Sequence, residues 1–141
     1  MIVDTLLIRL GGESGIDNAI SAGDVLTLSM ARSGYHVHTF RTYPAEIKGG
    51  PVMFQLRIGV KPVPSLGDKV DVLLAFNQEA WDLHQEALRP DGMLIYDPDE
   101  HDLPAGFRGM GCAVPLDRLA HDLNLRKGKN LIGLGVLSAL C

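Results

Sequence analysis

The sequence TLLIRLGGESGIDNAISAGDVLTLSMARSGYHVHTF (residues 5–40) indicates a strand, a glycine-rich loop, a helix and a second strand in succession. Thr5–Leu10 is a short, mostly apolar run, which is typical of a strand covered on both faces. Apolar or small residues then recur at helical spacing until the stop signal at Gly34: Ile16, Ile20, Gly23, Leu26 and Met30. The second strand is expected over Tyr35–Tyr43. Because Gly23 lies in the helical stripe, we expect the helix to approach the sheet closely there.

The same alternation continues along the rest of the chain. Further strands are expected over residues 52–60, 71–77, 93–96 and 111–114, and helices over 78–88, 116–123 and from 130 onward. Arg89–Gly92 has the composition of a turn. The step from Tyr43 to Val52 joins two strands without a helix, which makes the sheet mixed. The sequence therefore predicts one α/β domain over residues 1–141, a three-layer, Rossmann-like fold with a mostly parallel, mixed sheet.

The composition excludes several classes of protein. With 141 residues the chain has room for one domain, and its net charge of -4 argues against nucleic acid as a partner. Its two cysteines are too few for an iron–sulfur cluster or a structural zinc, and they indicate reduced thiols in a cytoplasmic protein. Met1–Asp4 lacks the basic start of a signal peptide, and no apolar run is long enough to cross a membrane.

The segment LIGLGVLSALC (residues 131–141) is apolar on every side. A helix of this kind belongs in an interior or in an interface. Either it completes a compact core, or the chain is one piece of something larger. The sequence favours the second interpretation, which predicts a domain truncated at its C-terminus and an oligomeric assembly.

A candidate ligand loop consists of Gly11, Gly12, Glu13, Ser14 and Gly15. A glycine loop between a strand and a helix places backbone N–H groups and the helix dipole where an anion binds. No Lys-Ser or Lys-Thr pair follows this loop, and the loop misses the G-x-G-x-x-G pattern. Since Glu13 would also repel a phosphate, a tight structural turn is at least as well supported as a binding loop.

Two other groupings give little support to a metal site or a catalytic centre. His36 and His38 share one face of a strand, but no third ligand follows at a matching spacing. The loop DPDEHD (residues 97–102) lacks the pattern of a calcium loop. Hydrogen-bonded or core histidines and a solvated loop are the favoured interpretations. We therefore expect no metal site, and no nucleophile motif indicates a catalytic residue.

The turn before the third strand is a more informative candidate. Gly49 and Gly50 permit the close approach of another surface or ligand, and Lys48 places a cation beside them. Alternation puts Gln55 and Arg57 on the strand face opposite to its apolar residues: Phe54, Leu56 and Ile58. One interpretation is a hinge with an ordinary exposed strand face. The other is a docking face, where Lys48 and Arg57 bind a carboxylate or a phosphate.

Four segments, in this order and spacing, resemble one family: GGESG (11–15), GYHVHTFRTYPAEIKGGPVMFQLRIG (34–59), VDVLLAFNQEA (70–80) and LRPDGMLIYD (88–97). They resemble the gamma subunit or gamma domain of 2-oxoacid:ferredoxin oxidoreductases, which act on pyruvate or 2-oxoglutarate. The domain that begins the alpha chain of two-subunit 2-oxoglutarate-type enzymes is especially similar. The most specific part is the Pro-x-x-Ile-Lys-Gly-Gly turn with Gln55 and Arg57. Lys48 stands where the family usually has arginine, and Ile16 stands where its glycine loop has glutamine.

The resemblance implies a part in the oxidative decarboxylation of a 2-oxoacid to an acyl-coenzyme A. The whole enzyme would use thiamine diphosphate, Mg, [4Fe-4S] clusters and coenzyme A, with ferredoxin as the electron acceptor. The chain lacks a GDG-type diphosphate motif and the cysteines for a cluster, so we expect it to bind no cofactor alone and to be inactive alone.

The role implied for the chain is to pack against the thiamine-binding alpha and beta chains, and to reach ferredoxin only indirectly. It would shape the coenzyme A side of the active site, with substrate or coenzyme A contacts from Lys48, Gly49, Gly50, Gln55 and Arg57. The alternative is a freestanding nucleotide-binding or regulatory module of the same fold, without catalytic activity.

Overall fold

The structure is a computed structural model, and it describes residues 5–13, 19–42, 51–61, 69–124 and 129–140. The strands are β1 (Thr5–Glu13), β2 (His36–Thr42), β3 (Pro51–Gly59), β4 (Val70–Ala75), β5 (Leu88–Tyr96) and β6 (Met110–Ala113). The helices are α1 (Ala19–Arg32), α2 (Gln78–His84), α3 (Leu116–Asp122) and α4 (Lys129–Leu140), and a 3-10 turn, Gln85–Ala87, follows α2. None of these helices is long and apolar enough to pass through a membrane.

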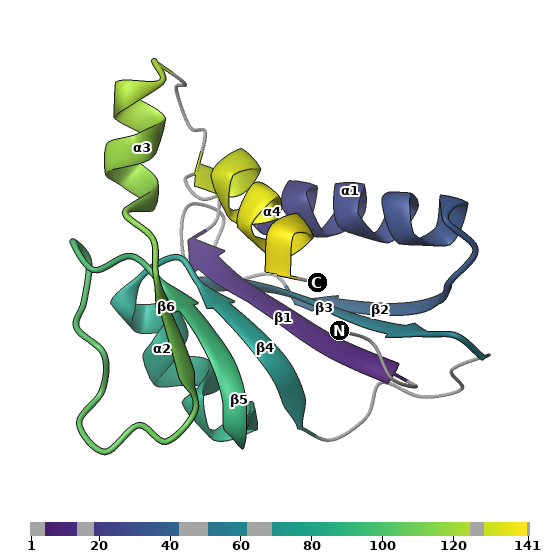
Figure 1. The fold of residues 1–141 in the computed structure, drawn as a ribbon, viewed down its shortest axis with the longest axis horizontal. Helices are drawn as coiled ribbons and strands as arrows, with labels where there is room; N and C mark the ends of the chain where they lie inside the picture. The colour runs from purple at the N-terminus through teal and green to yellow at the C-terminus, as the bar shows by residue number, and fades with distance from the viewer. Residues whose placement is uncertain (1–4, 14–18, 43–50, 62–68, 125–128, 141) are drawn as a thin grey trace.

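The strands form one six-stranded sheet in the order β2-β3-β1-β4-β5-β6 (Figure 1). Strands β1, β4, β5 and β6 are parallel to their neighbours in this series. In contrast, β3 runs antiparallel to both β1 and β2. Residues 43–50, which separate β2 from β3, are fewer than the crossover that a parallel pair needs. The predicted mixed, mostly parallel α/β sheet is confirmed.

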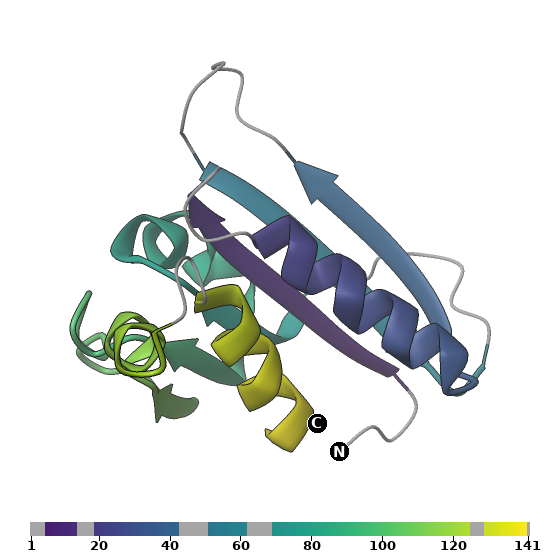
Figure 2. The ribbon, with the colours of Figure 1, turned by 90° about the horizontal axis from the view of Figure 1, so that it is seen from above.

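Helices cover both faces of the sheet, which gives three layers. Helices α1 and α4 lie side by side on one face, and α2 lies on the other (Figures 1 and 2). The core under α1 and α4 includes fully buried residues from five elements: Ile8, Leu10, Phe54, Leu74, Ile95 and Leu137. The core under α2 has a second set: Leu7, Leu73, Ala80, Trp81 and Leu94. Alternate residues of β1 and β4 thus enter different cores, as the apolar run in β1 predicted.

Gly23 brings α1 close to β3. The residue is buried, and a Cβ built on it would overlap the fully buried ring of Phe54. A side chain at this position would therefore push the helix away from the sheet. The predicted close approach of helix and sheet at Gly23 is confirmed.

The prediction of a loop over Gly11, Gly12 and Glu13 is wrong. Strand β1 continues to Glu13, which pairs with Pro51 at the start of β3. Strand β3 pairs with residues 11–13 and supplies hydrogen-bonding partners for their backbone groups. These residues therefore continue the strand and do not form a loop. The remaining two members of the predicted loop lie outside the described residues: Ser14 and Gly15.

The predicted turn over Arg89–Gly92 lies inside β5 as a bulge. These four residues stand opposite the single residue Asp71 of β4. Asp71 Oδ1 accepts a hydrogen bond from Arg89 Nη1 at 2.7 Å, and its Oδ2 accepts one from the backbone N–H of Leu7 at 2.9 Å. One carboxylate therefore ties the bulge of β5 to β1, and the turn-forming residues do not interrupt the strand.

Helix α4 packs against the sheet on one side. Leu137 is fully buried, and a Cβ on Gly133 would lie 2.8 Å from Leu74 Cδ2. A Cβ on Gly135 would meet no atom within 4 Å. The expectation that this apolar helix lies in an interior is thus met on the side that faces the sheet. A truncated domain and an oligomeric assembly stay predictions.

Candidate functional site

The two polar candidates of β3 lie on the face predicted for them. Gln55 is buried (4% exposed) and Arg57 is half-buried, whereas Phe54 belongs to the core under α1 and α4. In the antiparallel pair with β2, His38 stands opposite Arg57 and Phe40 stands opposite Gln55. Gln55 and Arg57 therefore share one side of the sheet with alternate residues of β2.

We call His36, His38, Phe40, Gln55 and Arg57 the open sheet face. These residues lie on the side of β2 and β3 away from α1, and no helix of the described chain covers the two strands on that side (Figure 1). Helix α2 lies further along the sheet, by β1 and β4. Phe40 is 45% exposed and His36 is exposed, while His38 and Arg57 are half-buried. An aromatic ring, two imidazoles and a guanidinium thus form a surface that a ligand or a partner can reach.

Arg9 projects from β1 on the same side of the sheet, opposite Gln55. Its Nε and Nη2 donate to Gln55 Oε1 at 2.8 Å and 2.5 Å, and its Nη1 lies 3.2 Å from His84 Nδ1. Burial lowers the pKa of Arg9. A guanidinium keeps its proton in proteins. Burial therefore makes the charged form of Arg9 less stable, but it does not make the side chain neutral. Three elements, β1, β3 and α2, therefore meet at one half-buried cation.

His84 lies at the end of α2, over the glycine of β1. A Cβ on Gly11 would come within 2.9 Å of His84 Cδ2, so the absence of a side chain at Gly11 gives the imidazole its place. Burial and then the charge of Arg9 lower the pKa of His84 from 6.5 to about 4. The ring is therefore neutral at pH 7, and its Nδ1 can accept a hydrogen bond from Arg9.

We expect His84 to make the protein less stable in acid. The His84 imidazole takes up a proton near pH 6.5 in the unfolded chain but only near pH 4 in the folded chain. The contribution of neutral His84 to the free energy of unfolding is therefore fully present above pH 6.5 and is lost as the pH falls toward 4. Since the imidazole is half exposed, screening reduces the expected loss to about 1–2 kcal/mol. Urea unfolding at pH 7 and pH 4.5 should show a smaller acid loss in His84→Gln than in the wild type. Equal losses in both proteins would contradict this assignment.

The structure brings together some of the predicted site residues and adds two that the sequence analysis missed. Gln55 and Arg57 share the open sheet face, and Gly11 contacts the same network through His84. The other predicted contacts, Lys48, Gly49 and Gly50, lie outside the described residues. The missed residues are Arg9 and His84. One signal was present, because Arg9 is the only charged residue in the apolar run TLLIRL.

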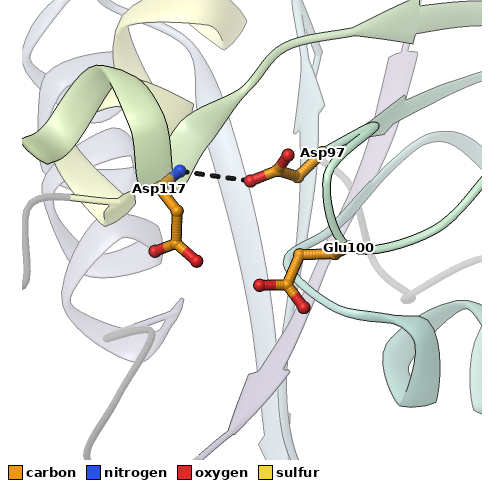
Figure 3. Close-up of side chains that lie close together, drawn as sticks. All are labelled: Asp97, Glu100 and Asp117. Atoms are coloured by element: carbon orange, nitrogen blue, oxygen red, sulfur yellow. Dashed lines mark hydrogen bonds between the residues drawn. The ribbon is translucent and has the colours of Figure 1, made fainter.

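A second cluster, of carboxylates, lies where β5 ends and α3 begins (Figure 3). Asp97, Glu100 and Asp117 each have an oxygen within 4.8 Å of the other two. Asp97 is fully buried, and its oxygens accept hydrogen bonds from the backbone N–H groups of Asp99 at 2.9 Å and Asp117 at 3.1 Å. The buried carboxylate thus holds the loop and the first turn of α3, which is a structural role. Neither His36 nor His38 belongs to a potential metal-binding group among the residues described.

Asp97→Ala should lower the free energy of unfolding by about 2–3 kcal/mol, because it leaves two part-buried N–H groups without their acceptor. Asp99→Ala is the matched control. It removes only an exposed ion pair with Arg118, so its expected cost is under about 1 kcal/mol. Urea unfolding of both variants measures the difference, and equal costs would show that Asp97 has no special role.

With this geometry in place, comparison with known proteins gives the family. Residues 8–141 match the family model described as "Pyruvate ferredoxin/flavodoxin oxidoreductase". The chain belongs to this family. The resemblance found in the four sequence segments is therefore confirmed over nearly the whole chain.

Two curated relatives of the chain in the pyruvate ferredoxin/flavodoxin oxidoreductase family are much longer than it is. Subunit alpha of 2-oxoacid:ferredoxin oxidoreductase 2 from Aeropyrum pernix is 37% identical over 97 residues, which are 69% of this chain and 15% of that protein. The 2-oxoglutarate oxidoreductase subunit KorA from Mycobacterium tuberculosis is 34% identical over 104 residues, 70% of this chain and 16% of that one. The chain thus spans only about one sixth of the length of these two relatives.

Solved structures in the family have the same fold. One is a 2-oxoglutarate:ferredoxin oxidoreductase from Magnetococcus marinus with 2-oxoglutarate, coenzyme A and succinyl-CoA bound. It matches with a TM-score of 0.89 at 35% identity, over 96% of this chain and 24% of that chain. The gamma subunit of a keto/oxoacid ferredoxin oxidoreductase from Geobacter sulfurreducens matches with a TM-score of 0.84 at 26% identity, over 98% of this chain and 77% of that subunit.

Proposed function

We propose that the chain is the gamma-type domain or subunit of a thiamine-diphosphate-dependent 2-oxoacid:ferredoxin oxidoreductase, which converts a 2-oxoacid to an acyl-coenzyme A. The observation that carries the proposal is the match of 96% of the chain, with a TM-score of 0.89, to an enzyme that holds 2-oxoglutarate, coenzyme A and succinyl-CoA. Family membership over residues 8–141 supports it, as do the curated relatives, which are named as subunits of a 2-oxoacid:ferredoxin oxidoreductase and a 2-oxoglutarate oxidoreductase.

The residues of this chain do not fit a thiamine diphosphate or iron–sulfur site. The sequence has two cysteines, where a cluster of this kind needs four thiolates, and it has no GDG-type diphosphate motif. In the proposed enzyme these cofactors, with Mg, belong to the thiamine-binding alpha and beta chains or domains, and ferredoxin takes electrons from them. This chain contributes packing surfaces and binding groups.

The open sheet face is the part proposed to act on the coenzyme A side of the active site. Gln55 and Arg57 lie together on it, and the Lys48-Gly49-Gly50 segment directly precedes the same strand. Guanidinium and ammonium groups suit the carboxylate of a 2-oxoacid and the phosphates of coenzyme A. We therefore propose these five residues as contacts to substrate or coenzyme A.

Co-purification tests the proposal. A tagged copy of the chain, expressed in its native host, should bring down chains that contain thiamine diphosphate and iron–sulfur clusters. The eluate should reduce a low-potential acceptor only when a 2-oxoacid and coenzyme A are added. A host strain with the tag alone is the control. If the chain elutes without such partners while the activity stays in other fractions, the freestanding nucleotide-binding or regulatory module is the correct assignment.

A further inference from the structure

The Arg9 guanidinium has more hydrogen-bond donors than the described residues use. A guanidinium carries five N–H groups. Two donate to Gln55 Oε1 and one faces His84 Nδ1, which leaves one N–H on each terminal nitrogen without a partner among the described residues. Gln55 and His84 therefore fix the plane of the guanidinium, and two of its donors are not used by the residues that the structure describes.

The charge of Arg9 is also unbalanced within the described chain. Its two partners, an amide oxygen and an imidazole, carry no negative charge at pH 7. In contrast, Arg41, Arg89 and Arg118 each have an aspartate oxygen within 2.7 Å. Charged groups removed from water are normally paired, because an unpaired charge there is costly. Arg9 differs from these arginines in being both half-buried and without a carboxylate.

We propose that Arg9, held in place by Gln55 and His84, binds a small-molecule anion through its two remaining N–H donors. The class of ligand is a carboxylate or phosphate group, which presents two oxygens to a planar guanidinium. Diagonal neighbours on paired strands lie roughly 7–8 Å apart, so the register puts Arg57 within reach of another part of the same ligand. Gln55 is then a positioning residue that acts through Arg9.

This inference rests on the proposed function, because it assigns a ligand group to the same side of the sheet. In that setting the anion is the carboxylate of a 2-oxoacid or a phosphate of coenzyme A. His84 accepts a hydrogen bond from Arg9 Nη1 and so helps to fix the orientation of the guanidinium. Because His84 is neutral at pH 7, it adds no second positive charge to the site.

Calorimetric titration of the full chain at pH 7.5 and constant ionic strength tests the proposal, with inorganic phosphate, 2-oxoglutarate and coenzyme A as separate ligands. We expect saturable binding of at least one ligand, and the strongest of the three identifies its source. Arg9→Gln should weaken that binding about tenfold or more, the scale of a charge-assisted contact. The control Arg118→Gln, an exposed arginine on α3, should leave the binding unchanged. No saturable binding to the wild type, or equal binding in both variants, would overturn the proposal.

A second variant tests the unbalanced charge of Arg9 through the thermal stability of the chain. Gln55→Glu places a carboxylate against the Arg9 fork with little change of shape. If the charge of Arg9 is unbalanced, this variant should raise the melting temperature in anion-free buffer by about 2–5 °C and lose the anion binding. If the charge of Arg9 is already paired with an anionic group, the new carboxylate is a buried charge without a partner of its own, and the melting temperature should fall. A fall would contradict the proposal even if Arg9→Gln fails to fold.

These measurements need no partner chain, so they separate the two proposals. Anion binding without co-purification would support the Arg9 site and count against the oxidoreductase assignment. Co-purification without anion binding by the wild type would leave the family role intact and reject the Arg9 site, with a carboxylate from a partner chain as the remaining occupant.

Discussion

The isolated chain is expected to turn over neither pyruvate nor 2-oxoglutarate, even with thiamine diphosphate, Mg²⁺ and coenzyme A added. The chemistry of the proposed reaction belongs to cofactors, and the sequence lacks the diphosphate motif and the four thiolates that would hold them. Reduction of a low-potential dye is a suitable assay, and the expected rate is that of the buffer blank.

The complex purified from the host serves as the positive control and should reduce the dye under the same conditions. Because no dye reduction at all is expected from the isolated chain, any turnover distinguishes an independent enzyme from a non-catalytic domain. Turnover of a 2-oxoacid by the pure chain would reject the assignment of a non-catalytic part.

Gly23→Ala is expected to lower the free energy of unfolding by about 3 kcal/mol, the upper end of the range for an overpacked core. The new Cβ would overlap the ring of Phe54, a β3 side chain that packs under α1 and is fully buried. Either the helix shifts or the ring leaves its place. Urea unfolding of the variant measures the loss.

Gly135→Ala is the matched control, since it makes the same change in another helix. A Cβ at Gly135 would meet no atom within 4 Å, so the higher helix propensity of alanine should stabilise the chain by about 0.5–1 kcal/mol. The two substitutions therefore have opposite expected signs. If both stabilise, the close packing at Gly23 is not a property of the protein in solution.

The fold could be predicted because its signals are local. The two-residue and helical periods of residues 5–40 identify the first three elements, and the short link between β2 and β3 identifies the antiparallel pair. The errors arose where a distant partner decides the structure. Gly11 and Gly12 lie in a strand, where they pair with Met53 and Val52 of β3. Arg89–Gly92 form a bulge opposite Asp71, and a hydrogen bond from Arg89 ties this bulge to β4.

The site was predicted only in part for the same reason. Alternation within β3 is enough to place Gln55 and Arg57 on one face. The contact between Arg9 and His84 joins residues 75 positions apart, and no local pattern in the sequence pairs them. A lone arginine in an apolar strand was the available clue, and it indicates a specific role only when its neighbours are known.

Steady-state kinetics of the assembled enzyme with Lys48→Ala or Arg57→Ala tests the central claim, that this region supplies anion contacts on the coenzyme A side. Loss of a charge-assisted contact weakens binding by about 1–3 kcal/mol, so KM for coenzyme A or the 2-oxoacid should rise about tenfold or more. The melting temperature should change little, and Arg118→Ala should change neither quantity. Unchanged kinetic constants in both variants, or a collapse of the fold, would show that the segment is a hinge between two strands and not a binding site.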